Sequence, residues 1–207
     1  HTPIVPAAEF QGKSGVSPYG DFVQQTDAAV GQVLDALEKM GVAKETLVIF
    51  TSDNGCSPAA DVATLRRQGH EPSGPLRGLK SDLWEGGHRV PFLARWPGQI
   101  AAGSECRETI CLTDLLAIAA AIVEAKLPDT AGEDSDNILP LLRGEKPASR
   151  RRDATVHHSI QGRFAIRQGE WKLLFAPGSG GWGAPTDPQA AKQKLPDVQL
   201  YNMAADL

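Results

Sequence analysis

The chain has 207 residues, of which 41% are hydrophobic and 22% are charged, and its formal net charge is −4. These values are ordinary for a globular protein, and without a basic surplus we expect no nucleic-acid partner. No apolar run is long enough for a transmembrane helix, so we also expect no membrane span.

The first predicted elements are a helix and a strand. Apolar residues at helical spacing predict a helix over 19–40, and Gly41 fits its C-terminal end. Residues 46–51 then form an apolar, β-branched run without polar alternation. Such a run is typical of a strand covered on both faces, as in the parallel part of an α/β sheet. A helix followed by a strand is one step of an α/β fold.

Two oxygen-bearing side chains, Asp53 and Asn54, stand at the carboxyl end of this predicted strand. Open α/β sheets bind ligands at the carboxyl ends of their strands. A carboxylate and an amide oxygen suit a hard cation such as Ca²⁺ or Mg²⁺. The sequence Asp-Asn-Gly is also a common turn, because Asn and Gly tolerate positive φ. By themselves, these residues leave open both a metal site and a plain turn.

The middle of the chain is rich in glycine and proline. Residues 55–89 form a long stretch with little regular structure, which is commonly functional in a compact domain. Beyond it the pattern predicts a short strand at 89–96, a largely buried helix at 109–123 and a short turn-and-helix element at 136–144.

The C-terminal part changes character from about residue 153 onward. Short strand-like runs separated by turns predict an antiparallel sheet. We therefore expect two domains, an α/β domain at 1–148 and a small antiparallel β subdomain at 149–207, with the boundary near 146–153.

Several segments together resemble one family. The runs FTSDNG, GPLRGLKSDLWEGGHRVPFLARWPG, TICLTDLLAIAAAI, DNILPLLRG and FAIRQGEWKLL occur in the order typical of sulfatases. The chain resembles the arylsulfatase-like members of the alkaline phosphatase superfamily over nearly its whole length, most specifically at 73–98. The resemblance implies the C-terminal part of an alkaline-phosphatase-like mixed sheet flanked by helices. It also implies sulfate-ester hydrolysis by a formylglycine nucleophile and a bound cation, usually Ca²⁺, with Mg²⁺ as the alternative.

The family's nucleophile motif, C/S-x-P-x-R, is missing. The run CSPAA at 56–60 has Ala60 in place of the arginine, and it follows the Asp-Asn pair instead of preceding it. We therefore expect this chain to be the C-terminal portion of a sulfatase and to be inactive alone. The formylglycine and two further acidic metal ligands are expected in the preceding half. The resemblance also implies a periplasmic or extracellular location, whereas the oligomeric state stays open.

The resemblance assigns roles to individual residues. Asp53 and Asn54 match the second pair of metal ligands, and Lys80 matches the lysine that contacts the sulfate. His1 resembles the histidine that binds sulfate and protonates the leaving oxygen, with an accidental terminal histidine as the alternative. Arg77 is expected to assist in substrate binding or to brace the loop. A plain surface lysine remains the alternative for Lys80.

A second set of residues lies around these positions. His157 and His158 are adjacent on a predicted strand, so only one of them can face the pocket, and we assign His158 to substrate binding. A surface histidine is an equal alternative. Glu85 and Arg89 are expected to pair and hold the loop around Gly86 and Gly87.

The substrate class stays open at this point. A sulfated glycan and an aryl sulfate present the same group to these residues, and both fit the resemblance. Alternatives to a sulfatase are a phosphonate or phosphodiester hydrolase of the same superfamily, and a sulfatase-like binding module without catalysis.

Overall fold

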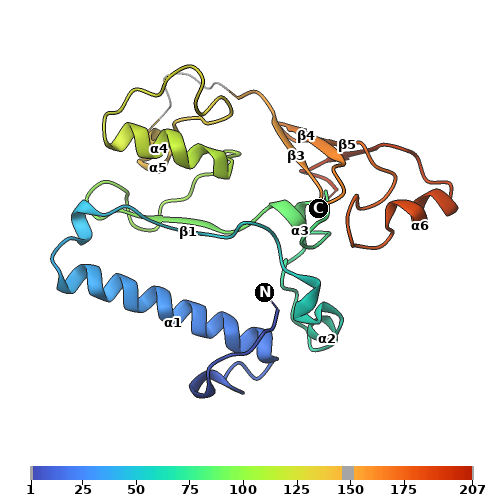
Figure 1. The fold of residues 1–207 in the computed structure, drawn as a ribbon, viewed down its shortest axis with the longest axis horizontal. Helices are drawn as coiled ribbons and strands as arrows, with labels where there is room; N and C mark the ends of the chain where they lie inside the picture. Colours follow the sequence, from blue (N-terminus) through green and yellow to red (C-terminus); the bar gives the residue numbers. More distant parts are fainter. Residues whose placement is uncertain (1, 146–151, 207) are drawn as a thin grey trace.

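The structure is a computed structural model that describes residues 2–145 and 152–206. Figure 1 shows helices and strands mixed along the chain, in agreement with the predicted α/β class. The helices are α1 (Pro18–Lys39), α2 (Val62–Arg67), α3 (Glu85–His88), α4 (Leu115–Ile122), α5 (Leu139–Leu142) and α6 (Asp187–Lys192). The strands are β1 (Val48–Thr51), β2 (Phe92–Arg95), β3 (Thr155–His158), β4 (Phe164–Gln168), β5 (Trp171–Leu174) and β6 (Gln199–Asn202). Short 3₁₀ turns occupy Ala8–Phe10, Ala43–Glu45, Pro58–Ala60 and Leu112–Asp114.

The long helix α1 confirms the prediction for 19–40. It begins after Ser17, whose hydroxyl accepts a hydrogen bond from the Gly20 N–H at 3.2 Å. Proline at the first helical position suits this start, because its fixed φ is already helical. The helix ends with Lys39, and Gly41 follows at a φ of +71°. These are local signals, which is why the sequence locates this helix well.

The strand predicted at 46–51 forms, but its surroundings differ from the expectation. It pairs antiparallel with β2, so that Val48 lies opposite Arg95 and Thr51 opposite Phe92. The prediction of a strand covered on both faces is wrong for the described residues, because Phe50 is 39% exposed. The strand pairs among these residues are antiparallel. An apolar run reports burial tendency, but it carries no information on the direction of the neighbouring strand.

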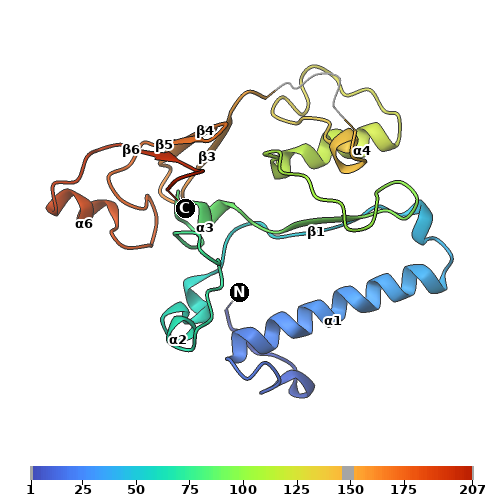
Figure 2. The ribbon, with the colours of Figure 1, turned by 180° about the vertical axis from the view of Figure 1, so that it is seen from behind.

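The predicted C-terminal antiparallel sheet is confirmed. Its strands follow one another in the order β3-β4-β5-β6, and each pair is antiparallel. Seen from behind in Figure 2, this sheet lies beside α3, apart from α1. The predicted boundary at 148/149 lies outside the described residues.

One hydrophobic cluster joins this sheet to the glycine-rich middle of the chain. It contains Leu83, Trp84, Ala165, Leu174 and Ala176, with Tyr201 packed against it. The loop before α3 is therefore part of the core of the C-terminal sheet.

A second cluster collects segments from the first part of the chain. Its buried residues are Ala60, Val62 and Leu65, and the residues packed against them are Ile4, Val16, Tyr19, Cys56 and Leu79. The cluster brings the N-terminal segment next to the loop after β1 and to the loop that carries Lys80.

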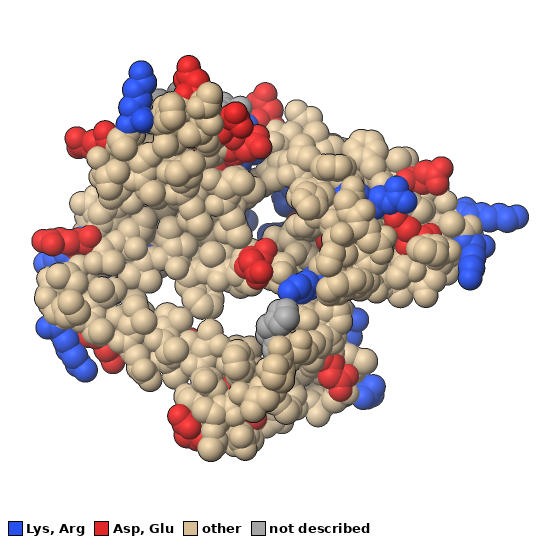
Figure 3. All heavy atoms as spheres, in the orientation of Figure 1, with Lys and Arg blue, Asp and Glu red and all other residues tan. Residues whose placement is uncertain are grey.

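The surface seen in Figure 3 carries acidic and basic side chains of both signs, scattered over the described residues of this face. None of the described helices combines the length and apolar character that crossing a bilayer requires.

Candidate functional site

Three segments meet at the carboxyl end of β1. The Gly55 N–H donates to the Gly87 carbonyl at 3.0 Å, and the Lys80 N–H donates to the Cys56 carbonyl at 2.9 Å. A Cβ atom on Gly55 would lie 1.7 Å from the Gly86 carbonyl oxygen, so only glycine permits this contact. Backbone hydrogen bonds therefore hold the loop after β1 between α3 and the Lys80 loop.

The predicted site residues on these segments have polar groups available for a ligand. Asp53 is exposed and Lys80 is half-buried. Within the described ranges, neither side chain makes a hydrogen bond or an ion pair. Asn54 donates from Nδ2 to the Gly55 carbonyl at 3.0 Å, and its Oδ1 atom has no partner among the same residues. Adjacent loops thus offer a carboxylate, an amide oxygen and an ammonium group.

Asp53 and Asn54 meet some of the needs of a divalent cation. A carboxylate and an amide oxygen are the ligand types that Ca²⁺ prefers, but Ca²⁺ takes about six to eight oxygen ligands. The described residues contain no cluster of three or more His, Cys, Asp or Glu side chains arranged to hold a metal. Asp53 and Asn54 therefore fit a cation in donor type, and they would supply only part of its ligands.

His1 lies outside the described residues, so its predicted role stays a prediction. The segment that follows it is placed, because Ile4 packs against the cluster that includes Cys56 and Leu79.

Arg77 is occupied by contacts within the protein. Its guanidinium carbon lies 3.7 Å from the centroid of the Trp84 ring, and its Nη1 atom donates to the Tyr201 hydroxyl at 3.3 Å. This position connects the Lys80 loop to the C-terminal sheet. These contacts fit the predicted role of bracing the loop, and the role of Arg77 in substrate binding stays a prediction.

His157 and His158 point to opposite faces of β3, as strand alternation predicts. His158 is exposed, with Nδ1 at 3.0 Å from the Ser159 carbonyl oxygen and its ring centroid 5.9 Å from that of Phe164. The ring centroid of His157 lies 4.2 Å from that of His88 on α3. The assignment of His158 to substrate binding stays a prediction.

The predicted pair between Glu85 and Arg89 is wrong. Glu85 instead accepts hydrogen bonds from Lys172 Nζ at 2.8 Å and from Arg167 Nη1 at 3.1 Å. Lys172 is only 1% exposed, and burial lowers its pKa while the Glu85 carboxylate opposes the shift. Since a buried ammonium needs a partner, the distant Lys172 takes the carboxylate. This pair anchors α3, and through Gly87 it anchors the Asp53 loop.

Sequence reasoning also missed Asp82, a fully buried carboxylate. Asp82 accepts from the Leu79 N–H at 2.9 Å and from the Gly183 N–H at 2.8 Å. It therefore fixes the loop that presents Lys80. Strand alternation offers a signal for Lys172, because it lies on the same face as the buried Leu174. No comparable local signal marks Asp82.

The buried histidine pair makes stability depend on pH. Burial, followed by the charge of Lys172, lowers the pKa of His88 to about 4 and that of His157 to about 3. The nearby Arg167 lowers the pKa of His157 further, and Glu85 partly offsets the shift at His88. The ordinary pKa is 6.5, so at mildly acidic pH the unfolded chain binds more protons than the folded one.

We expect the melting temperature to fall as the pH is lowered from about 6.5 towards 4. His157→Phe should make this fall shallower, because one of the two buried imidazoles no longer has to gain a proton on unfolding. Thermal unfolding across this pH range provides the measurement. The exposed His70 supplies the control, since His70→Gln should keep the original slope. Equal slopes for the His157→Phe variant and the unaltered protein would contradict the expectation.

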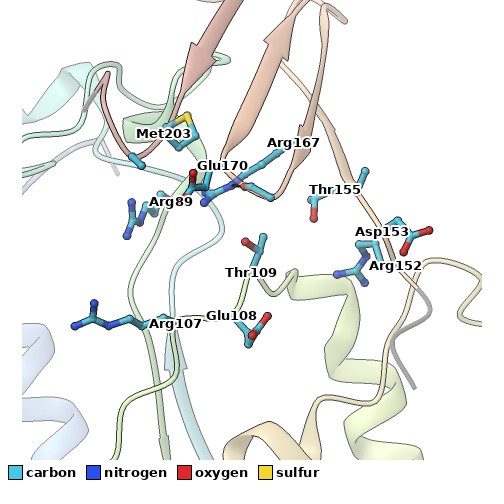
Figure 4. Close-up of a pocket in the computed structure, with 13 residues that line it drawn as sticks. Arg89, Arg107, Glu108, Thr109, Arg152, Asp153, Thr155, Arg167, Glu170 and Met203 are labelled. Atoms are coloured by element: carbon cyan, nitrogen blue, oxygen red, sulfur yellow. Dashed lines mark hydrogen bonds between the residues drawn. The ribbon is translucent and has the colours of Figure 1, made fainter. Parts of the chain in front are cut away.

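A cavity of about 470 Å³ lies between the C-terminal sheet and the segment at 107–109 (Figure 4). Its described lining includes none of the predicted site residues. Two of its arginines already have partners, because Arg152 pairs with Asp114 and Arg167 with Glu85. The cavity is therefore distinct from the Asp53–Lys80 site, and we assign it no role.

Comparison with known proteins places this geometry in a family. The sulfatase family model matches residues 1–124. The chain is 34% identical over its full length to an N-acetylgalactosamine-6-O-sulfatase of Bacteroides thetaiotaomicron, and it spans 40% of that protein. It is 37% identical over 91% of its length to human arylsulfatase A, and it spans 36% of that protein.

Solved structures agree with these matches. A sulfatase from work on the metabolism of multiple glycosaminoglycans by Bacteroides thetaiotaomicron superposes over the whole chain with a TM-score of 0.83 and 31% identity. The protein Ps i-CgsB, in complex with a k-i-k-neocarrahexaose, superposes with a TM-score of 0.74 and 27% identity. The chain covers 42% of each structure. By sequence and by fold, this chain belongs to the sulfatase family.

Proposed function

We propose that the protein hydrolyses a sulfate monoester, and that Asp53, Asn54 and Lys80 form part of its active site. The observation that carries this proposal is that Asp53 and Lys80 stand on adjacent loops held together by backbone hydrogen bonds, and that neither side chain makes a hydrogen bond or an ion pair within residues 2–145 and 152–206. Because the chain spans about 40% of its relatives, we assign the formylglycine nucleophile and the other metal ligands to the rest of a sulfatase domain.

Each residue of this half-site has a distinct task. Asp53 and Asn54 would hold a divalent cation, Ca²⁺ or Mg²⁺, which when bound would offset the negative charge of the sulfate. The Lys80 ammonium would bind a sulfate oxygen and stabilise the charge that builds up as the ester bond breaks. Lys172, Glu85 and Asp82 hold these loops in place, so that little reorganisation is needed when the substrate binds.

We propose a sulfated glycan as the substrate class. The support comes from two relatives, one named as an N-acetylgalactosamine-6-O-sulfatase and one solved with a neocarrahexaose. An aryl sulfate is the alternative, supported by the similarity to arylsulfatase A.

The complete sulfatase domain should hydrolyse 4-nitrophenyl sulfate. Chelation by EDTA should remove this activity, and added Ca²⁺ should restore it, because the cation completes the anion site. Residues 1–207 alone should show no turnover. A higher kcat/KM for bis(4-nitrophenyl) phosphate than for the sulfate ester would instead indicate a phosphodiesterase of the same superfamily. Turnover of neither compound, with Ca²⁺ present, would indicate a binding module.

A further inference from the structure

A single large side chain projects from the glycine-rich segment 178–183. Trp182 is 51% exposed, and its neighbours Gly181 and Gly183 are covered to a greater extent. Within the described part of the chain, its indole N–H makes no hydrogen bond and its ring stacks on no other ring. The segment therefore presents one open aromatic surface.

Hydrogen bonds fix this segment to the loop that carries Lys80. The Trp182 N–H donates to Ser81 Oγ at 2.9 Å, and the Gly183 N–H donates to Asp82 Oδ1 at 2.8 Å. In the other direction, the Leu83 N–H donates to the Ser179 carbonyl at 2.8 Å. Trp182 is thus bonded directly to the residue that follows Lys80 in the chain.

The other end of the segment is equally well held. The Gly180 N–H donates to Oδ1 of Asp187, a buried carboxylate at the start of α6. A Cβ atom on Gly181 would lie 2.4 Å from the Ser81 carbonyl oxygen, and one on Gly183 would lie 2.2 Å from Asp82 Oδ2. Glycine at both positions lets the backbone press against the Lys80 loop. The indole is consequently carried on a backbone that cannot shift without breaking buried hydrogen bonds.

We propose that Trp182 is a sugar-binding subsite beside the sulfate site, where the apolar C–H face of a pyranose ring stacks on the indole. This inference rests on the proposed function of Lys80. A sulfated sugar offers an anionic group for the Lys80 ammonium and a ring for the adjacent aromatic surface. Ligand sites commonly combine an aromatic wall with a few fixed polar groups, and Trp supplies a large contact area. The subsite would select sulfated glycans over sulfate esters without a sugar ring.

The test is calorimetric titration of the complete sulfatase domain with N-acetylgalactosamine 6-sulfate and with a sulfated neocarrahexaose. For whichever sugar binds the unaltered protein, Trp182→Ala should lower the affinity by about tenfold. Trp182→Phe should recover part of this loss. Inhibition of 4-nitrophenyl sulfate hydrolysis by inorganic sulfate should be unchanged in both variants, because the Lys80 contact is intact. The matched control is Trp171→Ala. Trp171 is the first residue of β5 and is 53% exposed.

The outcomes separate the subsite from the proposed function. Wild-type affinity for both sugars in Trp182→Ala would overturn the subsite, as would an equal loss in Trp171→Ala. A failure of the unaltered protein to bind either sugar, with 4-nitrophenyl sulfate still hydrolysed, would also overturn it while leaving the sulfatase activity in place. Conversely, the complete domain could bind a sugar through Trp182 and yet hydrolyse no sulfate ester. That result would support the subsite and contradict the proposed sulfatase activity.

Discussion

Lys80→Ala should lower kcat for a sulfate ester by about 100-fold or more in the complete sulfatase domain. The size follows from the removal of one preorganised electrostatic contact to a transition state that gains charge. Lys80→Arg should restore only part of the rate, because a planar guanidinium does not replace a compact ammonium. The measurement is kcat together with the melting temperature of each variant.

The structure makes this experiment decisive, because the Lys80 side chain makes no hydrogen bond or ion pair with the residues that the structure describes. Its loss should therefore leave the melting temperature nearly unchanged. The exposed Lys192 on α6 supplies a control, and Lys192→Ala should change neither quantity. A normal kcat for Lys80→Ala with a lowered melting temperature would show that Lys80 supports the fold and not the reaction.

Asp53→Ala should lower Ca²⁺ affinity and kcat together. The substitution removes a charged ligand from a hard-cation site, so the loss should reach at least the range of about tenfold to 100-fold that changes around metal ligands cost. Asn54→Ala should show a smaller loss, because it removes a neutral oxygen. Calorimetric titration of the complete domain with Ca²⁺ provides the measurement.

A matched surface carboxylate controls for charge alone. Asp27 is exposed on α1, and Asp27→Ala should leave Ca²⁺ affinity and kcat unaffected. Because Asp53 is also exposed and unpaired within the described ranges, its variant should keep its stability in the absence of Ca²⁺. Unchanged Ca²⁺ affinity in Asp53→Ala would show that Asp53 is not a metal ligand. The Asp-Asn-Gly sequence would then be interpreted as a simple turn.

Features that depend on neighbouring residues were predictable from the sequence. Helix α1 follows from its capping residues and its spacing of apolar side chains, and the C-terminal strands follow from their alternation and their turns. The end of β1 before Asp53 follows from the change from an apolar run to turn residues. The sequence motifs shared with sulfatases were specific enough to identify the family.

Features that depend on distant residues were decided only by the tertiary structure. The sequence analysis paired Glu85 with the nearby Arg89, but its partners are Arg167 and Lys172, which lie 82 and 87 residues away. Likewise, Asp82 binds the Gly183 N–H, 101 residues away, and so brings Trp182 to the Lys80 loop. The physical reason is burial: a charge enclosed by the core must be paired, and only the packed fold determines which groups are enclosed together.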